Sequence, residues 1–210
     1  MFYIIRNIAC ILLLINFILF ISKFKIENKP YKIYTIYLGV IVLIEILLRV
    51  FVSFGYQNLI LSHFYFTGQF ILLSLFYLEL LKENYQKLLV KFNLVIVPII
   101  LVIYFFINPI QLHQFCLIEI LLTSITLISY STFHFYNMLT NKKEFYLINC
   151  GILIYLFGST VTFLPRNLYT IYGVSFTMVL QSLNITLYLI YQIFIFLEWK
   201  KITSTTKNEK

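Results

Sequence analysis

Residues 33–54, IYTIYLGVIVLIEILLRVFVSF, contain only two charged side chains, Glu45 and Arg49. At about 1.5 Å per residue, a helix of this length crosses a hydrocarbon layer about 30 Å thick. The run therefore predicts a transmembrane helix. A glutamate and an arginine four residues apart lie on one face of such a helix, and we expect that face to point away from lipid.

The rest of the chain has the same character. It has 210 residues, of which 61% are hydrophobic and 11% charged, and its mean hydropathy is +0.91. Soluble proteins carry about 25% charged residues, so the composition predicts an all-α, polytopic membrane bundle. We expect one seven-helix domain over residues 1–199, followed by a short basic tail over 200–210. The predicted spans are 4–22, 33–54, 59–80, 92–108, 114–136, 145–164 and 174–197.

The lysines predict the orientation of the bundle. They occur only in segments 23–32, 82–91, 142–143 and 200–210, which follow the first, third, fifth and seventh spans. Among basic residues, the intervening connections hold only Arg166. Since cytoplasmic loops carry the excess of Lys and Arg, we expect the N-terminus outside and the C-terminus in the cytoplasm, in a bacterial inner membrane. Anionic lipid at the membrane border accounts for the net charge of +8, so we expect no nucleic acid partner.

Polar residues recur at helical spacing in several spans. Those of the seventh span form one stripe: Thr177, Gln181, Asn184, Tyr188 and Gln192. In the third span Ser62, Tyr65 and Gln69 share a face, whereas His63 and Thr67 point elsewhere. The first and fourth spans have few polar residues. We expect these two spans to face lipid and the other five to be inner helices.

The buried charges predict a polar cluster in the outer half of the bundle. We expect Arg49 to be held by Glu45, one turn away, and by Glu119 of the fifth span, which lies at a similar depth. The cluster either fixes helix packing through hydrogen bonds and an ion pair, or surrounds a cavity for a ligand, ion or proton. Its predicted members are Glu45, Arg49, His63, Gln69, Glu119, Gln181 and Asn184.

Signatures of catalysis do not occur in the sequence. There is no aspartate, H-E-x-x-H zinc motif, G-x-S-x-G elbow or P-loop. The three histidines lack metal-ligand spacing, and the three cysteines lie within predicted spans. We therefore predict no catalytic residues, metal or cofactor, and interpret the chain as a non-enzymatic membrane sensor or accessory subunit. Its expected partners are the lipid bilayer and a protein in the membrane or cytoplasm.

Two segments carry a resemblance: LILSHFYFTGQFILLSLFYLELLKE, 59–83, and VLQSLNITLYLIYQIFIFLEWKK, 179–201. They resemble uncharacterised seven-helix inner-membrane proteins of Bacteroidetes. Related blocks occur as membrane modules of sensor proteins, so this resemblance implies sensing or partner binding. In size and topology the chain is also similar to membrane accessory proteins of RNA-targeting CRISPR loci, which implies a role in prokaryotic defence.

Two other functions remain open. One is a transporter or channel for small solutes or ions, because polar stripes on several helices are able to line a path. The other is an intramembrane lipid-modifying enzyme that uses Glu45, Glu119 or His63 as acid or base.

Overall fold

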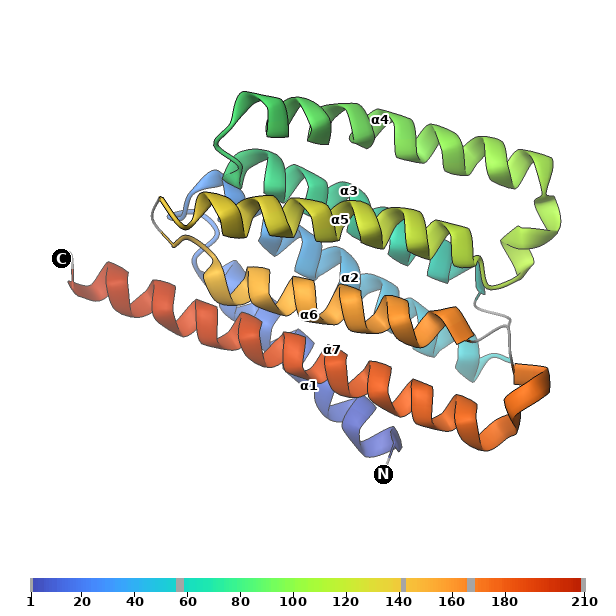
Figure 1. Ribbon diagram of the computed structural model, residues 1–210. Helices are drawn as coiled ribbons and strands as arrows, with labels where there is room; N and C mark the ends of the chain where they lie inside the picture. Colours follow the sequence, from blue (N-terminus) through green and yellow to red (C-terminus); the bar gives the residue numbers. More distant parts are fainter. Residues whose placement is uncertain (1, 56–58, 141–142, 166–168, 209–210) are drawn as a thin grey trace.

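The computed structural model describes residues 2–55, 59–140, 143–165 and 169–208, and this part of the chain is entirely helical apart from its connections (Figure 1). Its seven α-helices are all long and apolar enough to cross a membrane, as the sequence predicts. They are α1 (Phe2–Ser22), α2 (Lys29–Ser53), α3 (Leu59–Leu80), α4 (Asn84–Ile107), α5 (Leu117–Asn137), α6 (Tyr146–Phe163) and α7 (Tyr169–Asn208), with a short 3-10 helix η1 (Pro109–His113) before α5.

Several helices extend beyond the predicted apolar runs. Helix α2 begins at Lys29 because the Asn28 side chain accepts a hydrogen bond from the Tyr31 amide at 3.2 Å and Pro30 occupies the first turn. Helix α4 begins at Asn84, so its first turns contain charged residues that hydropathy alone assigns to the loop. Hydrophobic length thus identifies the spans but not their capped ends.

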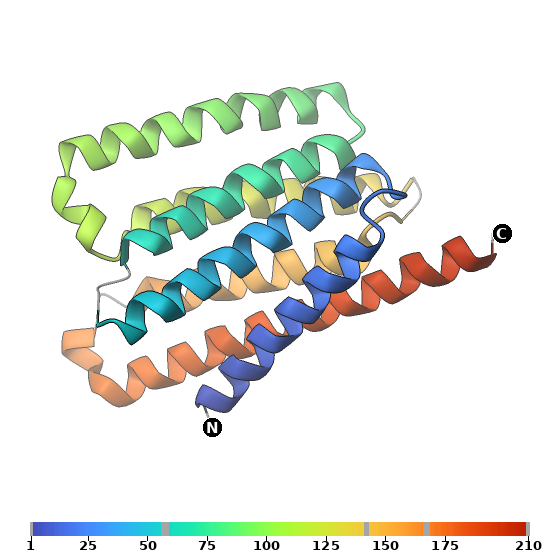
Figure 2. The same ribbon diagram turned by 180° about the vertical axis from the view of Figure 1, so that it is seen from behind.

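Six of the helices form a closed ring. Neighbours in the ring are α1 and α2, α2 and α3, α3 and α5, α5 and α6, α6 and α7, and finally α7 and α1. Helix α4 packs outside the ring against α3 and α5, where Figures 1 and 2 show it at the edge of the bundle. Most of its length is exposed, as expected for a lipid-facing helix.

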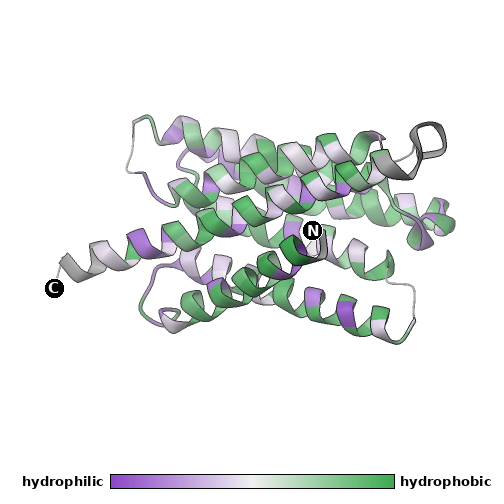
Figure 3. Ribbon diagram, turned by 90° about the horizontal axis from the view of Figure 1, so that it is seen from below, coloured by the Kyte–Doolittle hydropathy of each residue, from purple (hydrophilic) through white to green (hydrophobic). Residues whose placement is uncertain are grey.

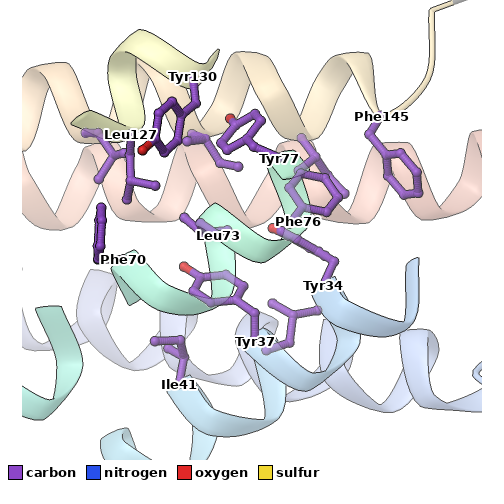
Figure 4. Close-up of a cluster of buried hydrophobic side chains, with 14 of the residues drawn as sticks. Tyr34, Tyr37, Ile41, Phe70, Leu73, Phe76, Tyr77, Leu127, Tyr130 and Phe145 are labelled. Atoms are coloured by element: carbon purple, nitrogen blue, oxygen red, sulfur yellow. The ribbon is translucent and has the colours of Figure 1, made fainter. Parts of the chain in front are cut away.

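Aromatic side chains fill the middle of the ring. Tyr34 and Tyr37 of α2 and Phe76 and Tyr77 of α3 are almost fully buried; Tyr34 contacts Phe76, and Tyr77 contacts Tyr130 of α5 (Figure 4). The Tyr34 and Tyr191 hydroxyls are hydrogen-bonded at 2.8 Å, which links α2 to α7. Such rings combine a large apolar area with a polar tip that finds a partner when buried.

The prediction that the first span faces only lipid is wrong. Helix α1 buries Ala9, Leu13, Asn16 and Phe20, which recur every three or four residues and form one face. The Asn16 amide donates to the Gln192 backbone and side-chain oxygens at 2.9 and 3.0 Å. One asparagine on an apolar helix therefore places α1 in the ring.

The two ends of the bundle differ in charge. The connections after α1, α3 and α5 and the end of α7 lie at one end, which we call the lysine-rich end, and Lys29 there pairs with Glu79 at 2.6 Å. The other end is called the lysine-poor end. Apolar colours cover most of the helical length between the ends (Figure 3). The segregation of lysine to one end is the arrangement that the positive-inside rule requires.

Candidate ligand cavity at the lysine-poor end

A cavity of about 280 Å³ lies inside the ring at the lysine-poor end. All ring helices except α5 contribute side chains to its wall. Ser62 and Phe163 lie near the ends of their helices, whereas Glu45 is eight residues before the end of α2, or about 12 Å deeper along the helix axis. The cavity thus extends from the membrane border well into the bundle.

Polar groups in the cavity wall have no protein partner among the described residues. The Glu45 carboxylate is half-buried and makes no hydrogen bond or ion pair within the described part of the chain. The Asn184 Oδ1 and Tyr188 hydroxyl atoms are buried and also lack a hydrogen-bond partner there. Neighbouring protein atoms cover both of these oxygens, so of the three groups Glu45 is the one that an occupant of the cavity meets, and its carboxylate favours a bound polar species.

Aromatic rings form the floor of the cavity. Tyr155 contacts Tyr188 with ring centroids 5.5 Å apart and stacks on Tyr191 at the same distance. The Tyr155 hydroxyl is 3.3 Å from that of Tyr65, and Tyr191 continues the contact to Tyr34 on α2. This layer of tyrosines separates the cavity from the lysine-rich end.

Arg49 does not have the partners that the sequence predicts. It is exposed, and its guanidinium donates two hydrogen bonds of 3.4 Å to the Asn7 side chain on α1. Both Arg6 and Arg49 lie within electrostatic range of Glu45, but among the described residues neither forms an ion pair with it. The predicted contact between Arg49 and Glu119 is wrong, because Glu119 lies against α3 and not against α2.

His63 and Glu119 form a separate site. The His63 Nδ1 atom is 2.5 Å from Glu119 Oε2, and the Thr67 hydroxyl donates to Oε1 at 3.1 Å. The imidazole also packs edge-on against Phe105 of α4, with centroids 5.0 Å apart. This pair therefore lies between α3, α5 and the outer helix α4, away from the cavity.

The remaining predicted members of the cluster also lie apart. Gln69 is buried in the ring interior and donates to the Tyr37 hydroxyl at 3.3 Å. Gln181 is exposed and lines a recess of about 40 Å³ that shares Phe163 and Asn184 with the main cavity. Of the seven predicted residues, Glu45 and Asn184 are the two that meet at the cavity.

Several cavity residues were not predicted. Arg6 and Cys10 of α1 line the wall, although the first span was expected to face lipid. The sequence contains a signal for their position. Arg6 lies three residues before Ala9, and Cys10 lies three residues before Leu13, so each is about one helical turn from a buried residue on the same side of α1. Tyr188 lies on the predicted α7 stripe, so helical periodicity did identify that wall of the cavity.

Metal ligation and similarity to known proteins give two further findings about the site. No group of three His, Cys, Asp or Glu side chains within the described ranges is placed to hold a metal ion. No protein-family model matches the chain, and neither a curated protein sequence nor a solved structure shows significant similarity to it.

Proposed function

We propose that the chain is a non-enzymatic, multi-pass protein of the bacterial inner membrane that binds a small ligand in the lysine-poor cavity and acts as a sensor or accessory subunit. The observation that carries this proposal is the Glu45 carboxylate, which lines a cavity inside the ring and has no ion pair or hydrogen bond among the described residues. Its volume of about 280 Å³ is near the lower end of the range for small-molecule sites, about 300 to 1,000 Å³.

The charge of the two ends supports an outward-facing site. Under the positive-inside rule the lysine-rich end is cytoplasmic, so the cavity and the N-terminus lie on the outer side of the membrane. A ligand from outside then reaches Glu45 without crossing the bundle.

The closed floor favours binding over passage. A solute that leaves the cavity toward the lysine-rich end meets the stacked rings of Tyr155 and Tyr191, with Tyr34 beyond them. The wall comes from five helices, so an occupant that contacts several of them stabilises one arrangement of the ring over others. A partner protein that packs on the outside of those helices is able to detect this change.

A thermal-unfolding screen tests the proposal. The purified protein in lipid nanodiscs is heated with a panel of amino acids, amines, carboxylic acids, sugars and nucleosides. A ligand that binds only the folded state at about 100 times its Kd stabilises the protein by about 2.7 kcal/mol. We expect at least one class of compound to raise the unfolding temperature of the wild type.

A matched pair of variants locates the effect. Ser62 lines the cavity, whereas Ser129 is exposed on α5, and each hydroxyl donates to its own helix backbone, at 2.5 and 3.0 Å. Ser62→Phe fills the cavity mouth and is expected to abolish the stabilisation, while Ser129→Phe retains it. Equal stabilisation of the two variants, or none of the wild type, would contradict a ligand site in this cavity.

A further inference from the structure

The unpartnered groups of the cavity define what an occupant must supply. A carboxylate accepts hydrogen bonds but donates none, and Asn184 Oδ1 is likewise an acceptor without a donor among the described residues. The Tyr188 hydroxyl is also without a partner there, but protein atoms cover it and Asn184 Oδ1, so the half-buried Glu45 carboxylate is the group that an occupant contacts. An occupant with N–H donors and a positive charge satisfies this carboxylate.

The aromatic wall favours the same charge. Tyr65, Phe66, Tyr155, Phe163 and Tyr188 surround the cavity, and the faces of such rings attract an ammonium group. Cation–π attraction is strongest where water is excluded. The rings also accommodate an apolar substituent next to the ammonium group.

Arg6 adds the opposite charge at the mouth. It lines the same cavity, is exposed, and lies within electrostatic range of Glu45 without forming an ion pair to it in the described structure. Two opposite charges that line one cavity without direct contact leave each able to bind a group of the other sign between them. A guanidinium is well suited to a carboxylate or a phosphate.

We propose that the cavity binds a zwitterion, with its primary ammonium group against Glu45 and its anionic group toward Arg6. This inference rests on the proposed ligand-binding function and specifies its ligand class. Two kinds of molecule carry a primary ammonium group beside an anionic group: a free amino acid, and the phosphoethanolamine headgroup of a lipid that enters from the membrane border. The volume of about 280 Å³ suits a molecule of this size rather than a sugar chain or a nucleotide.

Binding measurements with matched compounds test the ligand class. L-leucine and L-phenylalanine are each compared with the amine that lacks the carboxylate and the acid that lacks the amine, by calorimetry on the protein in phosphatidylcholine nanodiscs. For the lipid source, phosphatidylethanolamine replaces part of the phosphatidylcholine, with phosphatidylglycerol as control, and the unfolding temperature is measured. We expect one zwitterion source to bind, and each truncated free compound to bind at least tenfold more weakly than its parent.

Two charge variants and a control assign the contacts. Glu45→Gln is expected to weaken zwitterion binding at least tenfold, and Arg6→Gln to remove the preference for the zwitterion over the plain amine. Glu79→Gln makes the same change in a carboxylate that pairs with Lys29 at the opposite end, so binding is expected to stay unchanged. Unfolding of the ligand-free variants confirms that each is folded, and Tyr188→Phe gives a second, milder change in the same wall.

The outcomes separate this inference from the proposed function. A plain amine or acid that binds as tightly as the zwitterion would overturn the inference about the ligand class. If Ser62→Phe weakens that binding, the proposed ligand cavity is retained. Zwitterion binding that Glu45→Gln leaves unchanged also overturns the inference. If no compound or lipid acts through the cavity, both the inference and the proposed function fail.

Discussion

The His63 imidazole and the Glu119 carboxylate join α3 to α5 with an Nδ1 to Oε2 distance of 2.5 Å. Glu119 is fully buried, and Thr67 binds its second oxygen. The two carboxylate oxygens of Glu119 therefore both have partners at the point where α4 covers the ring, as Phe105 contacts the imidazole, while His63 Nε2 is buried without a partner among the described residues. The contact fixes the register of α3 on α5.

Removing one partner of this pair is expected to destabilise the bundle strongly. His63→Leu leaves the buried Glu119 carboxyl with Thr67 alone, and breaking a buried pair in this way costs about 3 to 5 kcal/mol. The double variant His63→Leu with Glu119→Leu removes both polar groups and is expected to recover most of that loss. Thermal unfolding in detergent measures the stability of both variants, and a double variant no more stable than His63→Leu would contradict this expectation.

Asn149 joins three helices and gives a second stability prediction. Its Oδ1 accepts hydrogen bonds from the Tyr77 hydroxyl at 2.7 Å and from Ser131 at 3.0 Å, and its amide donates to the Ser131 backbone at 3.1 Å. Tyr77→Phe removes one of these bonds and is expected to cost about 1 kcal/mol. Asn149→Leu leaves buried groups unpaired and is expected to cost more.

Tyr104→Phe is the matched control for the tyrosine change. Tyr104 lies on the outer helix α4, and no hydrogen bond of its hydroxyl is found in the described part of the structure. We expect its unfolding temperature to equal that of the wild type. A loss as large as that of Tyr77→Phe would mean that the Asn149 network contributes nothing specific.

Glycines on α6 set the distance between α6 and α7. A Cβ atom at Gly151 would lie 2.7 Å from the Tyr191 ring, which is buried and stacked on Tyr155, whereas one at Gly68 meets nothing nearer than 3.9 Å. Gly151→Ala is therefore expected to cost about 1 to 3 kcal/mol through overpacking, and Gly68→Ala to be tolerated. Unfolding curves of the two variants compare them directly, and a stable Gly151→Ala protein would place α6 farther from α7.

Membrane orientation is tested by fusion reporters that are active only outside the cytoplasm. Activity is expected for fusions near Gln57 and Gln111, and not for fusions near Asn28, Glu83 or Lys207. The reason is that the connections rich in lysine remain in the cytoplasm. The reverse pattern would place the cavity on the cytoplasmic side. Activity at both sets of positions would contradict seven spans.

Hydropathy and helical periodicity predicted the spans and their polar faces, but not which faces meet. The distinction between the Ser62, Tyr65 face and the His63, Thr67 face of α3 is confirmed, since the first pair lines the cavity and the second binds Glu119. Glu119 and Arg49 were predicted partners because they lie at similar depth. Depth does not determine the order of helices around a ring, and that order depends on packing between distant segments.

The contribution of α1 was missed for a related reason. Arg6 lies near the start of an apolar run, where a basic residue is ordinarily a membrane-border anchor. Only the tertiary contact of α1 with both α2 and α7 turns Arg6 and Cys10 toward the cavity. The carboxylate Glu45 was found from sequence because a charge within a span is itself a signal.

Access to Cys10 tests the central claim most directly, because this thiol lines the cavity. In a Cys116→Ser, Cys150→Ser background, a membrane-impermeant methanethiosulfonate reagent is added to either side of sealed vesicles. The Cys116 side chain is buried, whereas that of Cys10 is partly exposed, so a variant that retains only Cys116 is expected to react slowly and serves as the control. The account predicts rapid labelling of Cys10 from the lysine-poor side, slowed by any ligand that occupies the cavity. Labelling only from the lysine-rich side, or a Cys10 rate no faster than that of Cys116, would contradict it.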